Sequence, residues 1–412
     1  MKSIKVFIAL TCFFYLILLV TNQKTQAQSA AFRFIAWGDT KAGTYTLSGL
    51  SDQAASLSPN FTIYSGDLEV SGFTTDGMNK WKDAMNGKLT NSTTTNSMQG
   101  KTFAVRGNHD NEKYNSAVNW QNYFSYSNTA VKVGAVNYSY MSGKDDLIYS
   151  FDYGNSHFVG LDAIGDASTL TSAQITWLDS DLTNAEKRSL NNAFIFFHGP
   201  IYCAADHCSC TSRSCSLAAS VQNLVQIINK HPIVTATFHS HEHLYNYTYL
   251  DSSRIPGLTR PIHHFIAGDA GSGPSTVGCS KTYRYDYCMN EHGFLGVDVD
   301  GSNITVRFYK QGNTSPVYTK TFSRETATTV PTNILTITPT SIINVTLTPT
   351  KTPTPTKTVT PTIAPACKGG CYGSSYTCSR VACGGKACKR LTVSETITQC
   401  GWSTGTAYRC CQ

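Results

Sequence analysis

Five short clusters of residues that can bind metal ions recur along this chain. Each cluster directly follows a short apolar run, and the clusters read Gly38-Asp39-Thr40, Gly66-Asp67-Leu68, Gly107-Asn108-His109-Asp110, His198-Gly199-Pro200 and His241-Glu242-His243. Carboxylate, carboxamide and imidazole groups hold divalent and trivalent metal ions. A single Gly-Asp pair usually marks a turn, but five ordered clusters together indicate a metal site. The candidate ligands are Asp39, Asp67, Asn108, His198, His241 and His243.

Such a ligand set favours hydrolysis of phosphate esters. Two metal ions held ~3.5–4 Å apart clamp phosphate oxygens and stabilise both sides of an in-line displacement, and they lower the pKa of a bound water toward neutrality. The expected nucleophile is therefore a metal-bound hydroxide. His109 is the candidate general acid or phosphate-stabilising group, and Asp110 is expected to fix its tautomer. No GxSxG motif follows a predicted strand, so a serine nucleophile has no support.

The elements that position these clusters are predicted to be strands. Apolar runs rich in aromatic and branched residues span Phe32 to Trp37, Phe61 to Tyr64, Thr102 to Val105, Phe194 to Phe197 and Ile233 to Phe238, with later runs from His263 to Ala267, Phe294 to Val299 and Ile304 to Phe308. Helical patterns span Ser172 to Leu182 and Ser216 to Ile228. Ligands converge where parallel strands end, so the fold class is α/β.

The clusters resemble the motifs of the calcineurin-like metallophosphoesterase superfamily, most nearly its purple acid phosphatase branch. The resemblance covers roughly residues 32 to 310 and includes Tyr149 to Gly154, His157 to Asp162, Trp177 to Asp179 and His198 to Tyr202. It implies a sandwich of two mixed β-sheets flanked by helices, and two metal ions drawn from iron, zinc and manganese. It also implies that Asp67 bridges the ions, with Asp39 and His243 on one and Asn108, His198 and His241 on the other.

Three positions depart from the family pattern. Lys41 stands where the family's Asp-x-His motif has its histidine, so the first metal lacks one expected ligand. Val70 replaces the tyrosine of the purple enzymes, and no purple colour is expected. Ser240 replaces a glycine, which is expected to shift a turn and little more.

Two other histidines lie near the clusters in sequence. His207 belongs to the Cys-rich insert from Cys203 to Cys215, and it either approaches the substrate or, more in keeping with such a loop, lies on the surface. His239 is expected to be structural, with a supporting role for the ligands as the alternative.

The chain of 412 residues is longer than one domain usually grows. Residues 1–27 have the layout of a signal peptide, so the protein is expected to be secreted, with an uncleaved N-terminal anchor as the alternative. The remaining parts are the metallophosphoesterase domain (28–325), a Thr/Pro-rich linker (326–365) and a Cys-rich module (366–412). Outside the signal, six cysteines lie between Cys203 and Cys288 and eight between Cys367 and Cys411, both even sets, as disulfides require.

The formal charge of +7 is unevenly distributed. The Cys-rich module is basic and the large domain is mildly acidic, so no nucleic acid is expected as a partner of the large domain. A phosphate ester is the expected substrate, and a polysaccharide or cell surface is the candidate partner of the module. No membrane span is expected beyond the signal segment.

Phosphate monoesters are the first expectation for the substrate. A phosphodiesterase or nucleotide hydrolase on the same site is the first alternative. The second is an inactive scaffold, motivated by Lys41 and Val70, in which the Cys-rich module serves adhesion or glycan binding.

Overall fold

The computed structural model of this chain describes residues 30–70, 72, 74–90, 96–112, 116–163, 170–203, 207, 219–280 and 285–324, and three short strands nearer the C-terminus. The chain divides into two units, residues 1–330 and 331–412. The expected signal peptide, the linker and most of the Cys-rich module lie outside the described residues. Among those described, no helix has the length and apolar character needed to cross a membrane.

The first sheet of the large unit has six strands in the order β14-β13-β12-β1-β2-β3. The strands β1 (Phe32–Trp37), β2 (Phe61–Tyr64) and β3 (Thr102–Ala104) run parallel. On the other side of β1, the strands β12 (Gly293–Asp300), β13 (Asn303–Lys310) and β14 (Tyr318–Ser323) pair antiparallel. Because β1, β2 and β3 point the same way, the loops that follow them meet at one edge.

The second sheet has eight strands in the order β11-β9-β10-β8-β7-β6-β5-β4. Its centre is parallel and consists of β6 (Ser156–Gly160), β7 (Asn192–Phe196), β8 (Val234–His239) and β10 (Ile262–Ala267). Its antiparallel edges consist of β4 (Val136–Tyr140), β5 (Tyr149–Tyr153), β9 (Tyr245–Leu250) and β11 (Tyr287–Met289). Both sheets are therefore mixed, as the family resemblance implies.

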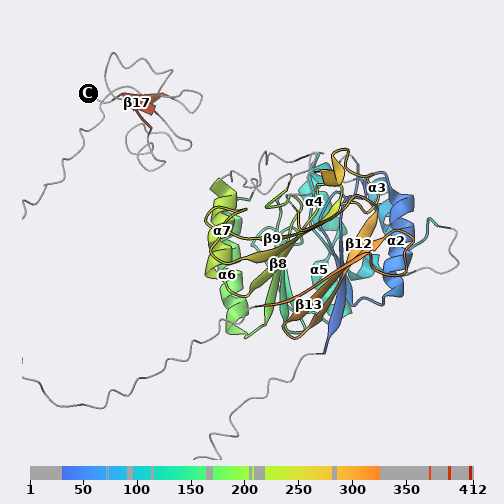
Figure 1. The fold of residues 1–412 in the computed structure, drawn as a ribbon. Helices are drawn as coiled ribbons and strands as arrows, with labels where there is room; N and C mark the ends of the chain where they lie inside the picture. The colour runs from blue at the N-terminus through green and yellow to red at the C-terminus, as the bar shows by residue number, and fades with distance from the viewer. Residues whose placement is uncertain are drawn as a thin grey trace, which may run out of the picture. The chain divides into compact units, whose positions relative to one another are not determined.

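Helices cover the two outer faces. Figure 1 shows α6 (Ser172–Lys187) and α7 (Ala219–Lys230) on one side of the sheets and α2 (Thr44–Ser56) and α3 (Thr75–Met85) on the other. The helices α4 (Ser116–Tyr123) and α5 (Tyr126–Val133) complete the domain, with single 3₁₀ turns at Gln99–Lys101 and His109–Asn111. Thr74 and Thr171 cap α3 and α6 by accepting a hydrogen bond from a backbone N–H of the first turn.

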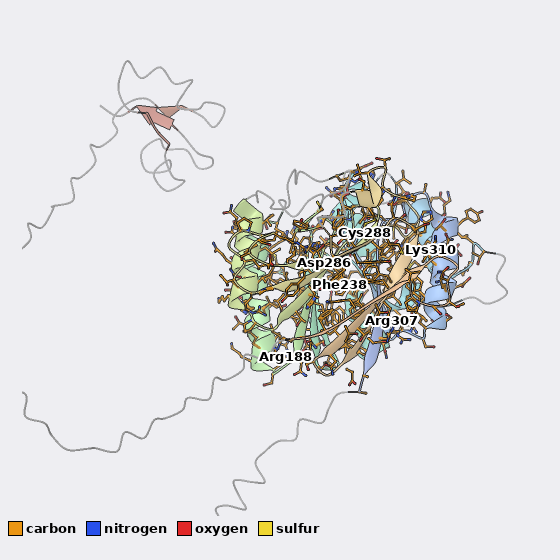
Figure 2. The ribbon with its side chains drawn as sticks, in the orientation of Figure 1. Arg188, Phe238, Asp286, Cys288, Arg307 and Lys310 are labelled. Atoms are coloured by element: carbon orange, nitrogen blue, oxygen red, sulfur yellow. A yellow bond between two sulfur atoms is a disulfide. The ribbon has the colours of Figure 1, made fainter. Side chains whose placement is uncertain are left out.

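The core lies between the sheets and is rich in phenylalanine. The ring of Phe34 on β1 lies 5.2 Å from Phe158, 5.7 Å from Phe194 and 5.6 Å from Phe238, which belong to β6, β7 and β8. All four side chains are fully buried, and Figure 2 labels Phe238. Each buried ring stabilises the fold by about 1.5–3 kcal/mol. These contacts place the strand ends of one sheet against those of the other.

A buried polar group ties β5 and β6 to α6. His157 lies between two carboxylates, with Nδ1 2.7 Å from Asp152 and Nε2 2.8 Å from Asp181. Arg188 donates to both oxygens of Asp152, at 2.7 and 2.9 Å. Every interior charge of this group therefore has a partner, as burial requires.

The predicted strands are confirmed, with ends that differ by one or two residues. Helix α6 continues five residues past the predicted end at Leu182, to Lys187. The buried Ala185 extends the buried face of the helix beyond Leu182.

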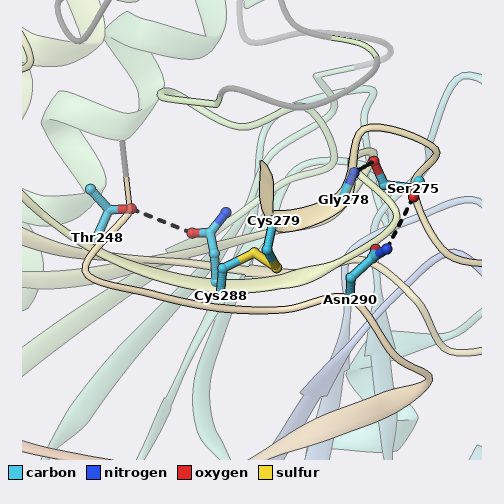
Figure 3. Close-up of a disulfide and its surroundings, with 7 residues drawn as sticks. Thr248, Ser275, Gly278, Cys279, Cys288 and Asn290 are labelled. Carbon is cyan, nitrogen blue, oxygen red and sulfur yellow. Dashed lines mark hydrogen bonds between the residues drawn. A yellow bond between two sulfur atoms is a disulfide. The ribbon is translucent and has the colours of Figure 1, made fainter. Parts of the chain in front are cut away.

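Cysteine pairing is seen in part. Cys279 and Cys288 form a disulfide (Figure 3). Cys203 is also disulfide-bonded. In the second unit, β15 (Cys371–Tyr372), β17 (Tyr408–Cys410) and β16 (Cys388–Arg390) form a small antiparallel sheet. The pairing of the eight cysteines in that unit stays a prediction.

Candidate metal centre

The loops after β1, β2, β3, β7 and β8 bring all six candidate ligands together. Asp39 follows β1, Asp67 follows β2 and Asn108 follows β3. From the second sheet, His198 follows β7, and His241 and His243 follow β8. Ligand atoms of Asp39, Asp67 and His198 lie within 4.8 Å of one another.

Three ligand atoms form a tight triangle in one half of the site. Asn108 Oδ1 lies 3.0 Å from His198 Nε2, and His241 Nδ1 lies 3.1 Å from each. The Oδ1 atom of Asp67 lies 3.5 Å from His198 Nε2. Ligands at about 2.0–2.2 Å from a metal ion are separated by roughly 3.0–3.5 Å from one another in octahedral or tetrahedral geometry. These four atoms therefore fit a metal ion.

The other half holds Asp39, the second oxygen of Asp67 and His243. Asp39 Oδ1 and Asp67 Oδ2 are buried and have no hydrogen-bond partner among the described residues. Asp39 Oδ1 lies 4.0 Å from His243 Nε2. Lys41 enters this half, with Nζ 3.0 Å from His243 Nε2 and 3.5 Å from Asp67 Oδ2. This half therefore already contains a cation.

The loops that carry the ligands have unusual backbone. Asp39, Lys41, Asp67 and His241 have φ values of 57°, 49°, 54° and 71°. Such left-handed conformations are uncommon for residues with a side chain and concentrate at functional sites.

Glycine allows the close approach of these loops. A Cβ atom on Gly66, which has a φ of 96°, would collide with the backbone of the next loop and with the ring of His198. Gly66 is therefore needed for packing between ligand loops.

Burial and mutual repulsion dominate the charge of the two carboxylates. Burial raises the pKa of Asp39 well above its usual range, and the charge of Asp67 raises it further. For Asp67, burial acts to raise the pKa, but His198, Lys41 and His109 outweigh it, and the pKa is lowered. A further positive charge between the two would stabilise both in ionised form.

The three ligand histidines are kept neutral. Burial lowers the pKa of His198, lowers that of His241 to about 2 with help from His198 and His207, and lowers that of His243 to about 4 with help from Lys41. Neutral imidazole is the form that binds metal.

Hydrogen bonds fix the orientation of His198. Its Nδ1 atom donates to the carbonyl of Ser65 at 2.8 Å, so that Nε2 carries the lone pair. The hydroxyl of Ser240 donates to the same carbonyl and lies 3.1 Å from His198 Nδ1. Ser240 therefore does more than shift a turn, contrary to the sequence expectation.

Asp110 does not contact the ring of His109, and the expectation that it fixes the tautomer of that ring is wrong. Its buried carboxylate accepts hydrogen bonds from the backbone N–H groups of Asp67, Leu68, Glu69 and Gly107. These residues belong to the loops after β2 and β3. Asp110 therefore holds two ligand loops together.

The partners of His109 are Val70 and Glu112. His109 Nδ1 lies 2.7 Å from the carbonyl of Val70 and 2.7 Å from the carboxylate of Glu112, so Nδ1 carries a proton. The other ring nitrogen, Nε2, lies 3.9 Å from Asp67 Oδ2. His109 therefore directs Nε2 toward the site, although the sequence pointed to a different partner.

His207 approaches the site from the Cys-rich insert. Its ring centre lies 4.9 Å from that of His241 and 5.3 Å from that of His243, and its backbone N–H donates to buried Glu242 at 2.9 Å. His207 is exposed, as expected for a surface loop. Its ring nevertheless lies beside His241 and His243, which corresponds to the alternative expectation that it approaches the substrate. His239 is buried, packs edge-to-face against Phe197 and donates to that residue's carbonyl, as expected for a structural histidine.

A family comparison agrees with this geometry. The model of a family described as calcineurin-like phosphoesterase matches residues 32–245, more than half of the chain. The chain belongs to the calcineurin-like phosphoesterase family. The superfamily expected from the motifs is thus confirmed, and members of this family use a centre of two metal ions. No curated protein matches the chain in sequence.

Several solved structures align with this calcineurin-like domain. A purple acid phosphatase from yellow lupin (Lupinus luteus) aligns with a TM-score of 0.52 and 15% identity, over 72% of this chain and 54% of the lupin protein. A dimetal phosphatase from Danio rerio aligns with a TM-score of 0.48 and 16% identity, over 71% of this chain and 99% of that protein. GAP50, the anchor in the inner membrane complex of Plasmodium, aligns with a TM-score of 0.47 and 15% identity, over 72% of this chain and 90% of that protein. At 15% identity, the likeness to the lupin protein concerns the fold alone.

Proposed function

We propose that this chain is a metal-dependent hydrolase of phosphate monoesters. The observation that carries the proposal is the triangle of Asn108 Oδ1, His198 Nε2 and His241 Nδ1, with edges of 3.0–3.1 Å. Asn108 Oδ1 and His198 Nε2 present lone pairs to each other, and a cation between the three atoms would satisfy all of them. Iron, zinc and manganese all accept this donor set. When bound, the metal supplies a Lewis acid and a water of lowered pKa.

The residues around the triangle are suited to phosphoester cleavage. Water adds to phosphorus, the bond to the ester oxygen breaks, and its electron pair stays on the departing alkoxide. His109 in its imidazolium form, with Nε2–H facing the site, would donate the proton that turns the alkoxide into an alcohol, and the proton lost by the attacking water restores that form. Inorganic phosphate is the second product.

A monoester is favoured over a diester because of the cationic and donor groups in the site. A monoester carries more negative charge on its terminal oxygens than a diester does. Lys41, His109 and His207 all lie at the ligand cluster, where they can donate hydrogen bonds to those oxygens. This set suits the more highly charged substrate.

The test compares two substrates on one preparation. The full chain, produced in an exporting host that forms disulfides, is stripped with a chelator and reloaded with iron, zinc or manganese. We expect hydrolysis of p-nitrophenyl phosphate to return with metal and to exceed that of bis(p-nitrophenyl) phosphate. His241→Ala should lower both metal content and activity, whereas His263→Ala, which changes a histidine outside the site, should lower neither. A folded, metal-loaded chain that cleaves neither ester contradicts the proposal.

Export to an oxidising compartment is part of the proposal. The disulfide between Cys279 and Cys288 supports it, since such bonds are rare in reducing compartments. We also propose that the basic Cys-rich module binds a polysaccharide or an anionic surface. The test compares how strongly immobilised polysaccharides retain the full chain and a chain that ends at residue 325. Stronger retention of the full chain would assign the binding to the region that includes residues 366–412.

A further inference from the structure

Lys41 lies in the half of the site that the family gives to the first metal ion. It follows β1 two residues after Asp39, and its backbone N–H donates to the carbonyl of Asp67 at 3.2 Å. Its side chain is only 17% exposed and turns inward. The ammonium nitrogen lies 3.0 Å from His243 Nε2 and 3.5 Å from Asp67 Oδ2.

Both partners of this ammonium are atoms that the first metal would need. The Nε2 atom of neutral His243 has one lone pair, which either accepts a hydrogen bond from Lys41 or binds a metal ion. The same choice applies to the inward side of Asp67 Oδ2. An ammonium and a metal ion therefore exclude one another in this half.

The charges agree with such a replacement. Asp39 and Asp67 bring two carboxylates to a buried place, and each needs a cation nearby. Lys41 supplies one positive charge from within the chain. The triangle of Asn108, His198 and His241 is not entered by Lys41 and stays open to a metal.

We propose that the ammonium of Lys41 replaces the first metal ion, so that this chain binds a single metal ion, held by Asp67, Asn108, His198 and His241. The inference rests on the proposed function for its metal chemistry. It adds a departure from the family: a cation built into the chain takes the place of one of two ions. His243 then accepts a hydrogen bond from Lys41 rather than binding a metal ion. Asp39 balances the charge of the ammonium and accepts a hydrogen bond from the backbone N–H of His241 at 2.7 Å.

The local backbone permits a restoring substitution. Lys41 has a φ of 49°, and histidine is among the residues that adopt this conformation more readily than most. Lys41→His therefore supplies the ligand that the family has at this position without new backbone strain. Lys41→Met removes the ammonium but adds no ligand of comparable strength.

The experiment counts metal ions. The full-length protein, Lys41→His, Lys41→Met and the control Lys88→His are loaded with excess manganese, dialysed and analysed for metal per chain, with electron paramagnetic resonance on the same samples. Lys88 is a half-exposed lysine that pairs with Asp83, so its change controls for the substitution itself. Circular dichroism confirms folding of each variant.

We expect one manganese per chain, with the spectrum of an isolated ion, in wild type and Lys88→His. Lys41→His should hold two with the spectrum of a spin-coupled pair. Lys41→Met should retain one tight ion and take up a second weakly in a titration, which keeps the inference testable if Lys41→His does not fold.

Two tight, coupled ions in the wild-type protein would overturn the inference and leave the proposed function intact. No tight ion in the wild-type protein would overturn both. One ion without hydrolysis of any ester would support the inference while removing the proposed function.

Discussion

Asn108 Oδ1 and His198 Nε2 lie 3.0 Å apart although neither carries a proton to share with the other. His198 places its proton on Nδ1, where the carbonyl of Ser65 accepts it. Two lone pairs thus face each other across a buried gap. A cation between them would stabilise the arrangement, which depends on the groups that hold His198 in this orientation.

Ser240→Ala tests that support. The change removes a hydroxyl that contacts both His198 and Ser65, so metal affinity should fall by about 10-fold, at the low end of what such supporting groups contribute. Competition with a metal indicator measures the affinity. Ser180→Ala, which removes an exposed hydroxyl on α6, is the control and should leave affinity unchanged. Equal affinities for all three proteins would show that Ser65 alone suffices.

His109→Gln tests proton donation to the leaving group. The rate constant kcat should fall by about 10²–10⁴-fold while the metal content is retained. The loss should be larger for an alkyl phosphate, whose alkoxide needs a proton, than for p-nitrophenyl phosphate, whose phenolate does not. A loss of equal size for both substrates would assign His109 to phosphate binding instead.

Glu112→Gln addresses the partner of His109. It weakens the contact at Nδ1 but leaves Nε2 in the site, so kcat should fall as in His109→Gln, by a smaller factor.

Asp110→Asn should act on the fold of the site rather than on proton donation. It disturbs four backbone contacts and should lower metal affinity and thermal stability together. Metal content and thermal unfolding separate the two variants.

His207→Ala tests whether the Cys-rich insert contacts the substrate. The ring is exposed beside His241 and His243, so its loss should raise KM by about 2- to 10-fold, the equivalent of one hydrogen bond, and change kcat little. Steady-state kinetics on p-nitrophenyl phosphate measure both constants. A lowered metal content in this variant would instead place His207 among the ligands.

His157→Gln tests the buried group between β6 and α6. Removal of one member of a buried charged network should lower the free energy of unfolding by about 3–5 kcal/mol. Urea unfolding of the metal-loaded protein measures the loss. A cost below about 1 kcal/mol would mean that Asp152 and Asp181 find other partners.

The same group predicts a pH dependence of stability. Burial acts to lower the pKa of His157, but its bonds to Asp152 and Asp181 outweigh burial and raise it. That contribution is fully present below the pKa of an unfolded histidine and is lost as the pH rises through the folded value. The pKa of Asp152 is lowered by His157 and Arg188 against the effect of burial, so its contribution is lost as the pH falls through that value. Wild-type stability should therefore peak between these limits, and His157→Gln should lack the decline on the alkaline side.

Much of the fold and the ligand set could be predicted because their signals are local. Each ligand motif follows a strand, and β1, β2 and β3, like β7 and β8, are parallel neighbours, so that loops far apart in sequence share one edge. The pattern of aromatic and branched residues predicted eight of the strands to within two residues, namely β1, β2, β3, β7, β8, β10, β12 and β13.

The supporting contacts could not be predicted because they depend on side-chain direction. Asp110 is adjacent to His109, yet neighbours on a 3₁₀ turn diverge, whereas Glu112 lies three residues on and returns to the imidazole. The sequence showed that Lys41 stands where the family has a histidine ligand. Its long flexible side chain gave no sign that it would turn inward to His243.

The four backbone amides gathered by Asp110 have a consequence for how the protein handles its metal. The chain itself, rather than an ion, sets the spacing between the loops after β2 and β3. These two loops should therefore keep their spacing when the site is empty. A metal ion would then enter two loops that are already spaced to receive it.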